Sequence, residues 1–572
     1  MDFHDAVALL TAPGQPFETE RITLPSSRIG DLVRDPVEVT AFRHAPGTLR
    51  EALGGRRAGA AGADDVFLVY EDERWTFAQV MATVDALAAQ LVDQYGVGKG
   101  DRVAIGMRNY PEWIVSFAAV VSIGAISVSL NAWWTEDELD YALEDSGATV
   151  LIADRERCER SRASAARLGI RTIGVRGAGE SGLPGVDPWD PPLGAPMPDV
   201  EVLPDDDATI LYTSGTTGHP KGAVSTHRAI THSLMAFACR TAVEGVRRQA
   251  QLPPGTEPPA PAAPPSFILI VPLFHVTGCV PVMLSCFVGG LKLVVMYKWD
   301  PLRALQLIER ERVTNFVGVP TQSWDLLECP QFGEYDTSSL VSVGGGGAPA
   351  PPELVKRVEG SFRTGRPQIG YGMTETNAYG PGNTGDDYVT HPTSTGRHVP
   401  ILELEVRDPE GVAVPTGELG EIWFKGPHLI RGYWNKPEAT AATIVDGWLR
   451  SGDLGRVDDE GFVYVVDRVK DMVLRAGENV YCAEVEAAIY EHPAVYEAAV
   501  FGVPHERLGE EVAAVIMLRP DATLTADELT AFLKQRIAGF KVPSRIAFRD
   551  AQLPRNASGK MLKRELRSVF TA

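Results

Sequence analysis

Residues 212–222, Tyr-Thr-Ser-Gly-Thr-Thr-Gly-His-Pro-Lys-Gly, have the composition of a polyphosphate-binding loop. The glycines let backbone N–H groups approach an anion, the hydroxyls add donors, and Lys221 supplies a mobile cation. The apolar run 208–211 directly precedes the loop, which predicts that a strand delivers it. Pro220-Lys221-Gly222 stands where a Walker A loop would end in Gly-Lys-Ser/Thr, so the loop indicates a different class of nucleotide site.

A second group of residues could enclose a purine. Residues 345–349, Gly-Gly-Gly-Ala-Pro, form a backbone ledge with few side chains, and Tyr371 offers a flat ring. The alternative for either piece alone is a tight turn beside a core tyrosine.

Three charged residues could complete a nucleotide site. Glu375 follows a predicted strand at 368–371, and its carboxylate is a hard oxygen ligand for a Mg²⁺ that phosphates also hold. Asp453 can accept two hydrogen bonds from a ribose diol, and Arg468 adds a forked cationic donor near the sugar or phosphates. Otherwise Glu375 is a solvated charge and Arg468 belongs to an exposed ion pair.

The order of these motifs resembles that of the adenylate-forming superfamily, which contains acyl-CoA synthetases, amino-acid adenylation domains and luciferases. Besides the loop at 212–222, the segments that resemble family signatures are 272–278, 345–349, 371–375, 451–453, 467–471 and 554–560. The resemblance covers nearly the whole chain, except for the first sixty or so residues and a Pro-rich stretch at 245–265.

This resemblance assigns roles at the nucleotide site. The residues it implies for ATP binding are Thr213, Ser214, Gly215, Thr216, Thr217, Gly218, Lys221, Gly346, Gly347, Ala348, Pro349, Tyr371, Gly372, Met373, Thr374, Asp453, Arg468 and Lys560. Thr216 and Glu375 are the implied Mg²⁺ ligands. Lys560 is the implied catalytic lysine of adenylation, assisted by Lys221.

The acyl and thiol sites are also implied by the resemblance. The expected acyl pocket consists of His275, Thr277, Gln322, Trp324 and Gly345. His275 is the implied gate and a third catalytic candidate, with a core histidine as the alternative. Amino-acid-activating relatives place an aspartate where this chain has Val276, so an uncharged fatty or aryl acid is favoured. Lys470 is the implied hinge, and Gly477 would line the CoA passage.

The implied reaction has two steps and requires ATP, Mg²⁺ and CoA. A carboxylic acid attacks the α-phosphorus of ATP, pyrophosphate leaves, and the CoA thiol then attacks the acyl-adenylate and expels AMP. One alternative is an acyl-AMP ligase that loads the phosphopantetheine of a carrier protein. Another is a non-catalytic protein that binds a nucleotide or an acyl group.

The elements that must position these residues form an α/β fold. Residues 73–92 show helical periodicity with a Thr76/Gln79 capping box, and residues 291–319 read as a β-α-β unit. We expect a large multi-subdomain N-terminal body, residues 1–469, with parallel-rich sheets covered by helices. Residues 470–572 are expected to form a small α+β domain, which the resemblance makes mobile. Residues 245–265 are predicted to be an extended surface loop.

Composition excludes several other classes of protein. The 572 residues include 54 Lys+Arg and 75 Asp+Glu, and a net charge of -21 opposes nucleic-acid binding. The six cysteines lack metal-ligand spacing, and no secretory signal opens the chain, so a cytoplasmic location is expected. The apolar runs 113–130 and 266–297 are interrupted, which argues against an integral membrane protein. Peripheral membrane contact and an oligomer such as a dimer stay open.

Overall fold

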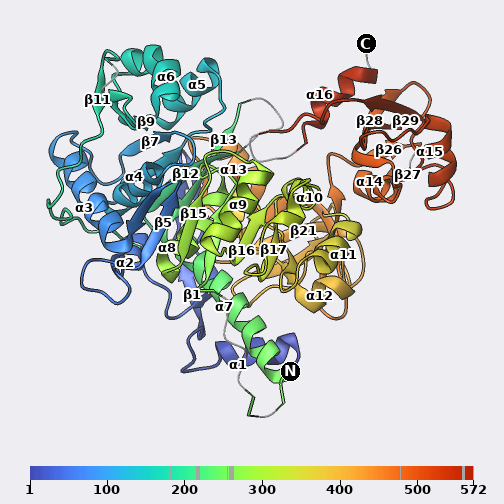
Figure 1. The fold of residues 1–572 in the computed structure, drawn as a ribbon, viewed down its shortest axis with the longest axis horizontal. Coiled ribbons are helices and arrows are strands. Elements are labelled where there is room, and N and C mark those ends of the chain that lie inside the picture. The colour runs from blue at the N-terminus through green and yellow to red at the C-terminus, as the bar shows by residue number, and fades with distance from the viewer. Residues whose placement is uncertain are drawn as a thin grey trace.

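The computed structural model describes residues 1–179, 182–213, 219–253, 255–256, 263–348, 350–476, 478–556 and 561–570. Two eight-stranded sheets and a five-stranded sheet precede Arg468, and another five-stranded sheet follows it. Figure 1 shows this last part, in orange and red, to one side of the rest of the molecule. The prediction of an α/β fold with parallel-rich sheets is confirmed.

One eight-stranded sheet carries the two described ends of the phosphate loop. Its order is β11-β10-β9-β7-β8-β12-β13-β22; β11 to β12 run parallel and the last two strands antiparallel. The bounds are β7 Arg102–Gly106, β8 Ile126–Ser129, β9 Val150–Ala153, β10 Arg171–Gly174, β11 Val186–Pro188, β12 Asp207–Thr213, β13 Lys221–Thr226 and β22 Gly432–Tyr433.

The other eight-stranded sheet carries the glycine-rich ledge. Its order is β19-β18-β17-β16-β14-β15-β5-β6, with six parallel strands between two antiparallel edge strands. The bounds are β5 Val66–Tyr70, β6 Glu73–Thr76, β14 Ser266–Leu269, β15 Lys292–Val295, β16 Asn315–Gly318, β17 Ser342–Gly346, β18 Arg366–Gly370 and β19 Gly382–Thr384.

Helices cover both sheets and share one core with them. Every residue of α4 is buried, and its side chains join a core cluster that contains residues of both sheets. The helices of the body are α1 Phe3–Thr11, α2 Leu49–Gly54, α3 Phe77–Asp93, α4 Pro111–Ser122, α5 Glu136–Ser146, α6 Arg155–Leu168, α7 His227–Gln251, α8 Ser285–Gly289, α9 Pro301–Glu311, α10 Pro320–Leu327, α11 Pro352–Ser361, α12 Gly385–Thr390 and α13 Pro437–Thr443.

The remaining strands make smaller sheets. Near the N-terminus β1 Thr19–Leu24 pairs with β4 Val37–Phe42, and β2 Ser27–Ile29 pairs with β3 Leu32–Arg34. A five-stranded sheet precedes the C-terminal part and contains β20 Glu403–Arg407, β21 Gly420–Lys425, β23 Ile444–Val445, β24 Trp448–Val457 and β25 Val463–Arg468.

The C-terminal part has its own sheet and its own apolar core. Its elements are β26 Val473–Arg475, β27 Glu478–Val480, α14 Cys482–Tyr490, β28 Val495–His505, β29 Gly509–Leu518, α15 Ala526–Leu533, β30 Arg545–Arg549 and α16 Lys563–Arg567. We call this part the small domain and the preceding part the body.

Local sequence signals predicted several elements well. The capping box between Thr76 and Gln79 is present, and it starts α3 at Phe77, so residues 73–76 of the expected helix are strand instead. The predicted β-α-β unit is observed as β15, α9 and β16, and β14 lies between its two strands. In the part of the chain that the structure describes, no helix combines the length and hydrophobicity needed to cross a bilayer.

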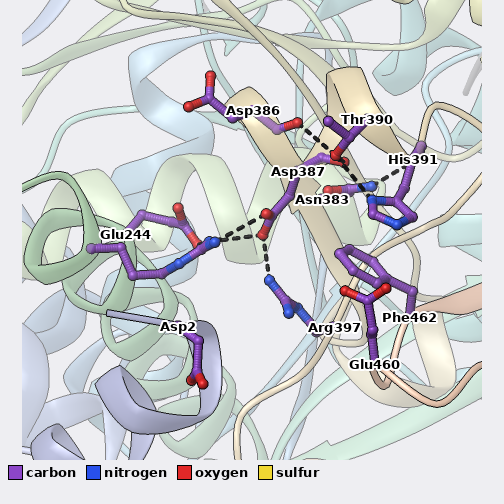
Figure 2. A network of polar contacts seen from close by, with 12 residues as sticks. Asp2, Glu244, Asn383, Asp386, Asp387, Thr390, His391, Arg397, Glu460 and Phe462 are labelled. Atoms are coloured by element: carbon purple, nitrogen blue, oxygen red, sulfur yellow. Dashed lines mark hydrogen bonds and ion pairs between the residues drawn. The ribbon is translucent and has the colours of Figure 1, made fainter. Parts of the chain in front are cut away.

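The predicted loop at 245–265 is wrong for its first residues, because α7 continues to Gln251. Arg247 donates to Glu244 and to Asp387 of α12, so this helical turn has partners. In Figure 2, Asp387 lies between Arg397 and the helix that carries Glu244. The helix ends at Gln251, because Leu252 precedes Pro253 and the residue before a proline disfavours helical backbone angles. Residues 254 and 257–262 lie outside the described residues.

Candidate active site

The glycine ledge lies where the parallel strands of the second sheet end. Gly345 and Gly346 close β17 between β16 and β18. A Cβ on Gly345 would lie 1.8 Å from the Gly318 carbonyl oxygen, and one on Gly346 would lie 2.4 Å from that of Gly370. Both positions therefore require glycine, and the carboxyl edge of such a sheet is where ligands of α/β proteins usually bind. Pro349 of the predicted ledge lies outside the described residues.

Tyr371, Asp453 and Arg468 come together beside this ledge. Tyr371 follows β18 and donates its hydroxyl to Asp453 Oδ2 at 2.6 Å. Asp453 and Arg468 are paired across β24 and β25, with Arg468 Nε 3.3 Å from Asp453 Oδ1. Burial, with the adjacent carboxylate, raises the pKa of Tyr371, so its hydroxyl stays protonated and donates. The structure thus assembles the predicted ring, carboxylate and guanidinium.

A second tyrosine, Tyr433 of β22, connects Glu375 with Lys221. Its hydroxyl donates to Glu375 Oε1 at 2.6 Å, and Lys221 Nζ lies 4.2 Å from the centre of its ring. Burial followed by the Glu375 charge raises the pKa of Tyr433. The predicted metal ligand and the predicted loop cation therefore lie on either side of one phenol. Sequence reasoning missed Tyr433.

The turn that carries Glu375 is anchored by Asn377, which is fully buried. Asn377 donates to the His428 carbonyl at 2.9 Å and accepts from the Ser225 hydroxyl at 2.9 Å. The Glu375 carbonyl accepts from Ile430 N at 3.0 Å. These contacts attach Met373, Thr374 and Glu375 to β13 and to the segment before β22. Asn377 was also missed by sequence reasoning.

The described ends of the phosphate loop are held by a paired strand. Thr213 closes β12 opposite Lys221 of β13, and its hydroxyl donates to the Lys221 carbonyl at 3.3 Å. The antiparallel pairing returns the chain so that Lys221 lies beside the start of the loop. The loop residues Ser214, Gly215, Thr216, Thr217 and Gly218 lie outside the described residues, as does any metal contact of Thr216.

Asp145 of α5 supports the start of this loop. Its carboxylate accepts from the Tyr212 hydroxyl at 2.8 Å and from Lys436 Nζ at 2.9 Å. Tyr141, one turn earlier, donates to the Pro220 carbonyl at 3.3 Å, and its ring stacks on His219 at 4.3 Å. Because these residues come from three segments that are distant in the sequence, no local pattern could have identified the cluster.

The predicted acyl-pocket residues do not all lie together. Gly345 packs on Gly318, and a Cβ on Gly318 would lie 2.7 Å from Gln322 Oε1. Gln322 also accepts from Val319 N at 2.9 Å and donates to the Ile270 carbonyl at 3.3 Å, which ties α10 to the end of β14.

His275 and Thr277 follow β14, with Thr277 N donating to His275 Nδ1 at 3.3 Å. Trp324 lies elsewhere on α10, where its ring contacts Arg357 at 5.1 Å and Arg519 of the small domain at 5.7 Å.

Lys470 lies between the body and the small domain. Burial and the nearby charge of Arg468 lower its pKa, and Lys221 and Asp453 also act on it electrostatically. Its ammonium is therefore within range of the predicted nucleotide site. The predicted catalytic Lys560 and the predicted CoA-passage residue Gly477 lie outside the described residues.

This arrangement is chemically suited to a magnesium nucleotide. The described residues contain no cluster of three His, Cys, Asp or Glu side chains that could hold a metal by themselves. Glu375 nevertheless fits Mg²⁺, because this ion usually takes one or two protein carboxylates and completes its shell with phosphates and water. Lys221, which lies over the ring of Tyr433, adds positive charge near Glu375.

Two family models match the chain. The model of the AMP-binding enzyme covers residues 55–434, and the model of the AMP-binding enzyme C-terminal domain covers residues 484–560.

Curated relatives match over most of their length. A feruloyl-CoA synthase from Amycolatopsis sp is 38% identical over 499 residues, which is 86% of this chain and 94% of the relative. A long-chain-fatty-acid–CoA ligase, FadD13, from Mycobacterium tuberculosis is 34% identical over 506 residues, covering 88% and 94% of the two chains.

Solved structures of related enzymes share the fold. ATP-bound MatB from Rhodopseudomonas palustris has a TM-score of 0.78 and 29% identity, covering 91% of this chain and 99% of its own. The o-succinylbenzoate CoA synthetase from Bacillus subtilis, in complex with an acyl-adenylate, has a TM-score of 0.73 and 30% identity, covering 90% and 97%. The chain belongs to the AMP-binding enzyme family and is an ATP-dependent acyl-CoA ligase.

Proposed function

We propose that this ligase activates a fatty or aryl acid with an uncharged tail. The observation that supports this most directly is Val276, which is only 3% exposed and follows His275 at the predicted acyl gate. A buried valine there cannot pair with a charged group of the substrate. The feruloyl-CoA synthase and the long-chain-fatty-acid–CoA ligase among the relatives are named for an aryl and a fatty acid, respectively.

In this proposal the nucleotide lies along the carboxyl edge of the second sheet. The adenine would lie between the glycine ledge and the ring of Tyr371. Asp453 would accept from the ribose hydroxyls, because each carboxylate oxygen has two lone pairs and only one is used by Tyr371 or Arg468. Arg468 would add a donor toward the sugar or phosphates.

The acid attacks the α-phosphorus of ATP, forming a C–O–P bond and expelling pyrophosphate. Mg²⁺, when bound, would neutralise phosphate charge, and Glu375 would hold it. Lys221 and the loop hydroxyls would stabilise the charge that spreads over the transferring phosphoryl group, and Lys560 would do so from the small domain. His275 would border the reacting carboxylate at the acyl gate.

The second step needs a different set of neighbours around the same acyl-AMP. The CoA thiol loses its proton and attacks the acyl carbon, the C–O bond of the mixed anhydride breaks, and AMP leaves with the bridging oxygen. We propose that the small domain, beginning at residue 470, pivots at Lys470 between the steps. This rotation would withdraw Lys560 and bring Gly477 to the thiol passage.

Pyrophosphate release across a panel of acids tests the substrate class. Fatty acids of increasing length and aryl acids such as hydroxycinnamates should support release, whereas amino acids should not. Turnover of an amino acid above that of every uncharged acid would contradict the proposal. Comparison of CoA with a holo carrier protein as acceptor separates the ligase from a carrier-loading enzyme, because only the ligase requires free CoA.

The catalytic role of Lys560 predicts a selective defect. Lys560→Ala should lower acyl-AMP formation by about a hundredfold or more, because a charge that acts only in the transition state is lost. Attack of CoA on supplied acyl-AMP should change little. Matched losses in the two half-reactions, measured by rapid quench, would remove Lys560 from the adenylation step; Lys534→Ala serves as a control on the same domain.

A further inference from the structure

A carboxylate on α10 connects the body with the small domain. Asp325 Oδ2 accepts from Trp299 Nε1 of the body at 2.8 Å, and Asp325 Oδ1 accepts from the Tyr496 hydroxyl of β28 at 3.0 Å. Burial raises the pKa of Asp325, and the two donors act against this shift. Burial and the Asp325 charge in turn raise the pKa of Tyr496, so its hydroxyl remains a donor.

A second contact lies one helical turn further, at the end of α10. Glu328 forms ion pairs with Arg357 of the body, at 3.0 Å, and with Arg519 of the small domain. The Arg519 guanidinium also lies over the rings of Trp324 and Tyr496, at 5.7 and 5.8 Å. We call Trp324, Asp325, Glu328, Tyr496 and Arg519 the interdomain latch. In Figure 1, α10 lies on the side of the body that faces the small domain.

The latch lies next to the base of the loop that carries Lys560. Arg555, at the start of this loop, forms an ion pair with Glu497 at 2.9 Å. Glu497 directly follows the latch residue Tyr496 in the sequence. Both charges act on Asp325 across the domain boundary. Arg555 and Met561 form an isolated β-bridge, so the described ends of the loop are held together.

The other end of α10 reaches the predicted substrate site. Gln322 connects the start of this helix to β14 and to Gly318, which packs under the glycine ledge. One eight-residue helix therefore contacts the site at its first turn and the small domain at its last. This placement relates the position of the small domain to the site through a rigid element.

From these contacts we propose that the interdomain latch holds the small domain in the orientation that serves acyl-AMP formation, which makes its members positioning residues for this half-reaction. This inference rests on the proposed adenylation role of Lys560. It adds a specific contact set that favours one of the two orientations, and that set must break before the thiol step.

The latch contacts can break without leaving a buried charged side chain unpaired. When the small domain leaves, Asp325 keeps Trp299 and Glu328 keeps Arg357. The side chains of Arg519 and Glu328 are 32% and 21% exposed, so water can replace the lost partner. Partly exposed contacts of this kind contribute modestly, which suits a bond that must form and break in each turnover.

The test compares the two half-reactions in variants of the small domain. Tyr496→Phe removes one hydroxyl, and Arg519→Gln removes one cation. With an acid that the panel identifies, each variant should form acyl-AMP about three- to tenfold more slowly, and the double variant more slowly still. The rate at which CoA converts supplied acyl-AMP should be unchanged or higher.

Two matched controls separate this effect from general damage. Tyr95→Phe removes a hydroxyl that donates to Asp187 at 2.9 Å within the body, and Arg536→Gln removes an ion pair with Glu491 within the small domain. Both controls should leave both half-reactions at the wild-type rates.

Three results in the latch variants would overturn the latch proposal. They are equal losses in both half-reactions, a loss confined to the CoA step, and wild-type rates in both variants. Lys560→Ala separates this from the proposed function. If Lys560→Ala loses acyl-AMP formation while the latch variants do not, the function stands and the latch fails. If Lys560→Ala forms acyl-AMP normally, the proposed function fails at its catalytic lysine, and the latch fails with it.

Discussion

Two predicted ligand-binding carboxylates are held by the same kind of partner. A phenol donates to Asp453 at 2.6 Å, and another donates to Glu375 at 2.6 Å. A neutral hydroxyl orients a carboxylate without neutralising its charge, and Asp453 has the Arg468 guanidinium as a second, cationic partner. Burial keeps both phenols protonated because it raises their pKa values. The tyrosines therefore orient these carboxylates for the ribose and metal roles proposed above.

At the scale of single residues, Glu375 and Tyr433 give two related predictions about the magnesium requirement. Glu375→Gln should raise the Mg²⁺ concentration needed for half-maximal pyrophosphate release by about tenfold or more, because an amide is a weaker ligand than a carboxylate. Tyr433→Phe keeps the ring under Lys221 and should cause a smaller increase in the same direction. Magnesium titrations at saturating ATP measure both.

The exposed Glu353 of α11 provides the control, since Glu353→Gln changes a carboxylate of the same size that takes part in none of these contacts. An unchanged magnesium requirement in Glu375→Gln would remove this residue from the metal site.

At the scale of elements, close strand packing positions the site. The ends of β16, β17 and β18 approach so closely that glycine is required at successive positions. Sequence reasoning interpreted these glycines as a ledge for a purine. The structure adds that the backbone of the neighbouring strand occupies the space of a side chain, so binding surface and sheet packing depend on the same residues.

Gly345→Ala should therefore be severely destabilising. Its Cβ would lie 1.8 Å from a backbone oxygen that cannot move without breaking the pairing of β16 with β17. We expect a loss of about 3 kcal/mol or more in unfolding free energy, or failure to accumulate as soluble protein. Gly333→Ala, which meets nothing within 4 Å, should stay within about 0.5 kcal/mol in the same denaturant titration. Equal stability of the two variants would contradict the packing argument.

At the scale of the whole molecule, buried histidines make the body sensitive to acid. Burial lowers the pKa of His227 and His232 to about 4 and that of His428 to about 3. In the unfolded chain these groups bind protons near pH 6.5, so the unfolded state binds more protons between pH 6.5 and 4. Stability therefore falls as the pH falls through this window. Asp467 acts in the opposite direction, because burial raises its pKa to about 6.

Thermal unfolding should show this effect as a midpoint that falls between pH 7 and pH 5. His428→Gln cannot become charged, so it should lose about 1–2 kcal/mol less than the wild type over this interval. His4→Gln, at an exposed position, should follow the wild-type pH dependence. A wild-type slope in His428→Gln would show that its protonation does not limit stability in acid.

Contiguous motifs could be interpreted from the sequence because their chemistry is local. Glycines, hydroxyls and Lys221 lie within eleven consecutive residues, and Asp453 and Arg468 occupy adjacent strands of one hairpin. The start of α3 was predicted for the same reason, since a capping box needs only residues three apart. The extent of α7 was not, because the partner of Arg247 is Asp387 on a distant helix.

The sequence by itself determined the fold class, because this depends on periodicity and short spacing, and the order of its motifs carried the resemblance to the family. Only the tertiary structure decided that Tyr433 joins Glu375 to Lys221, that Asp145 supports the loop, and that α10 contacts the small domain. Those contacts join segments from separate sheets and domains. Which residues become partners in these contacts depends on how the sheets and helices pack, and this packing cannot be predicted from the pattern of any one segment.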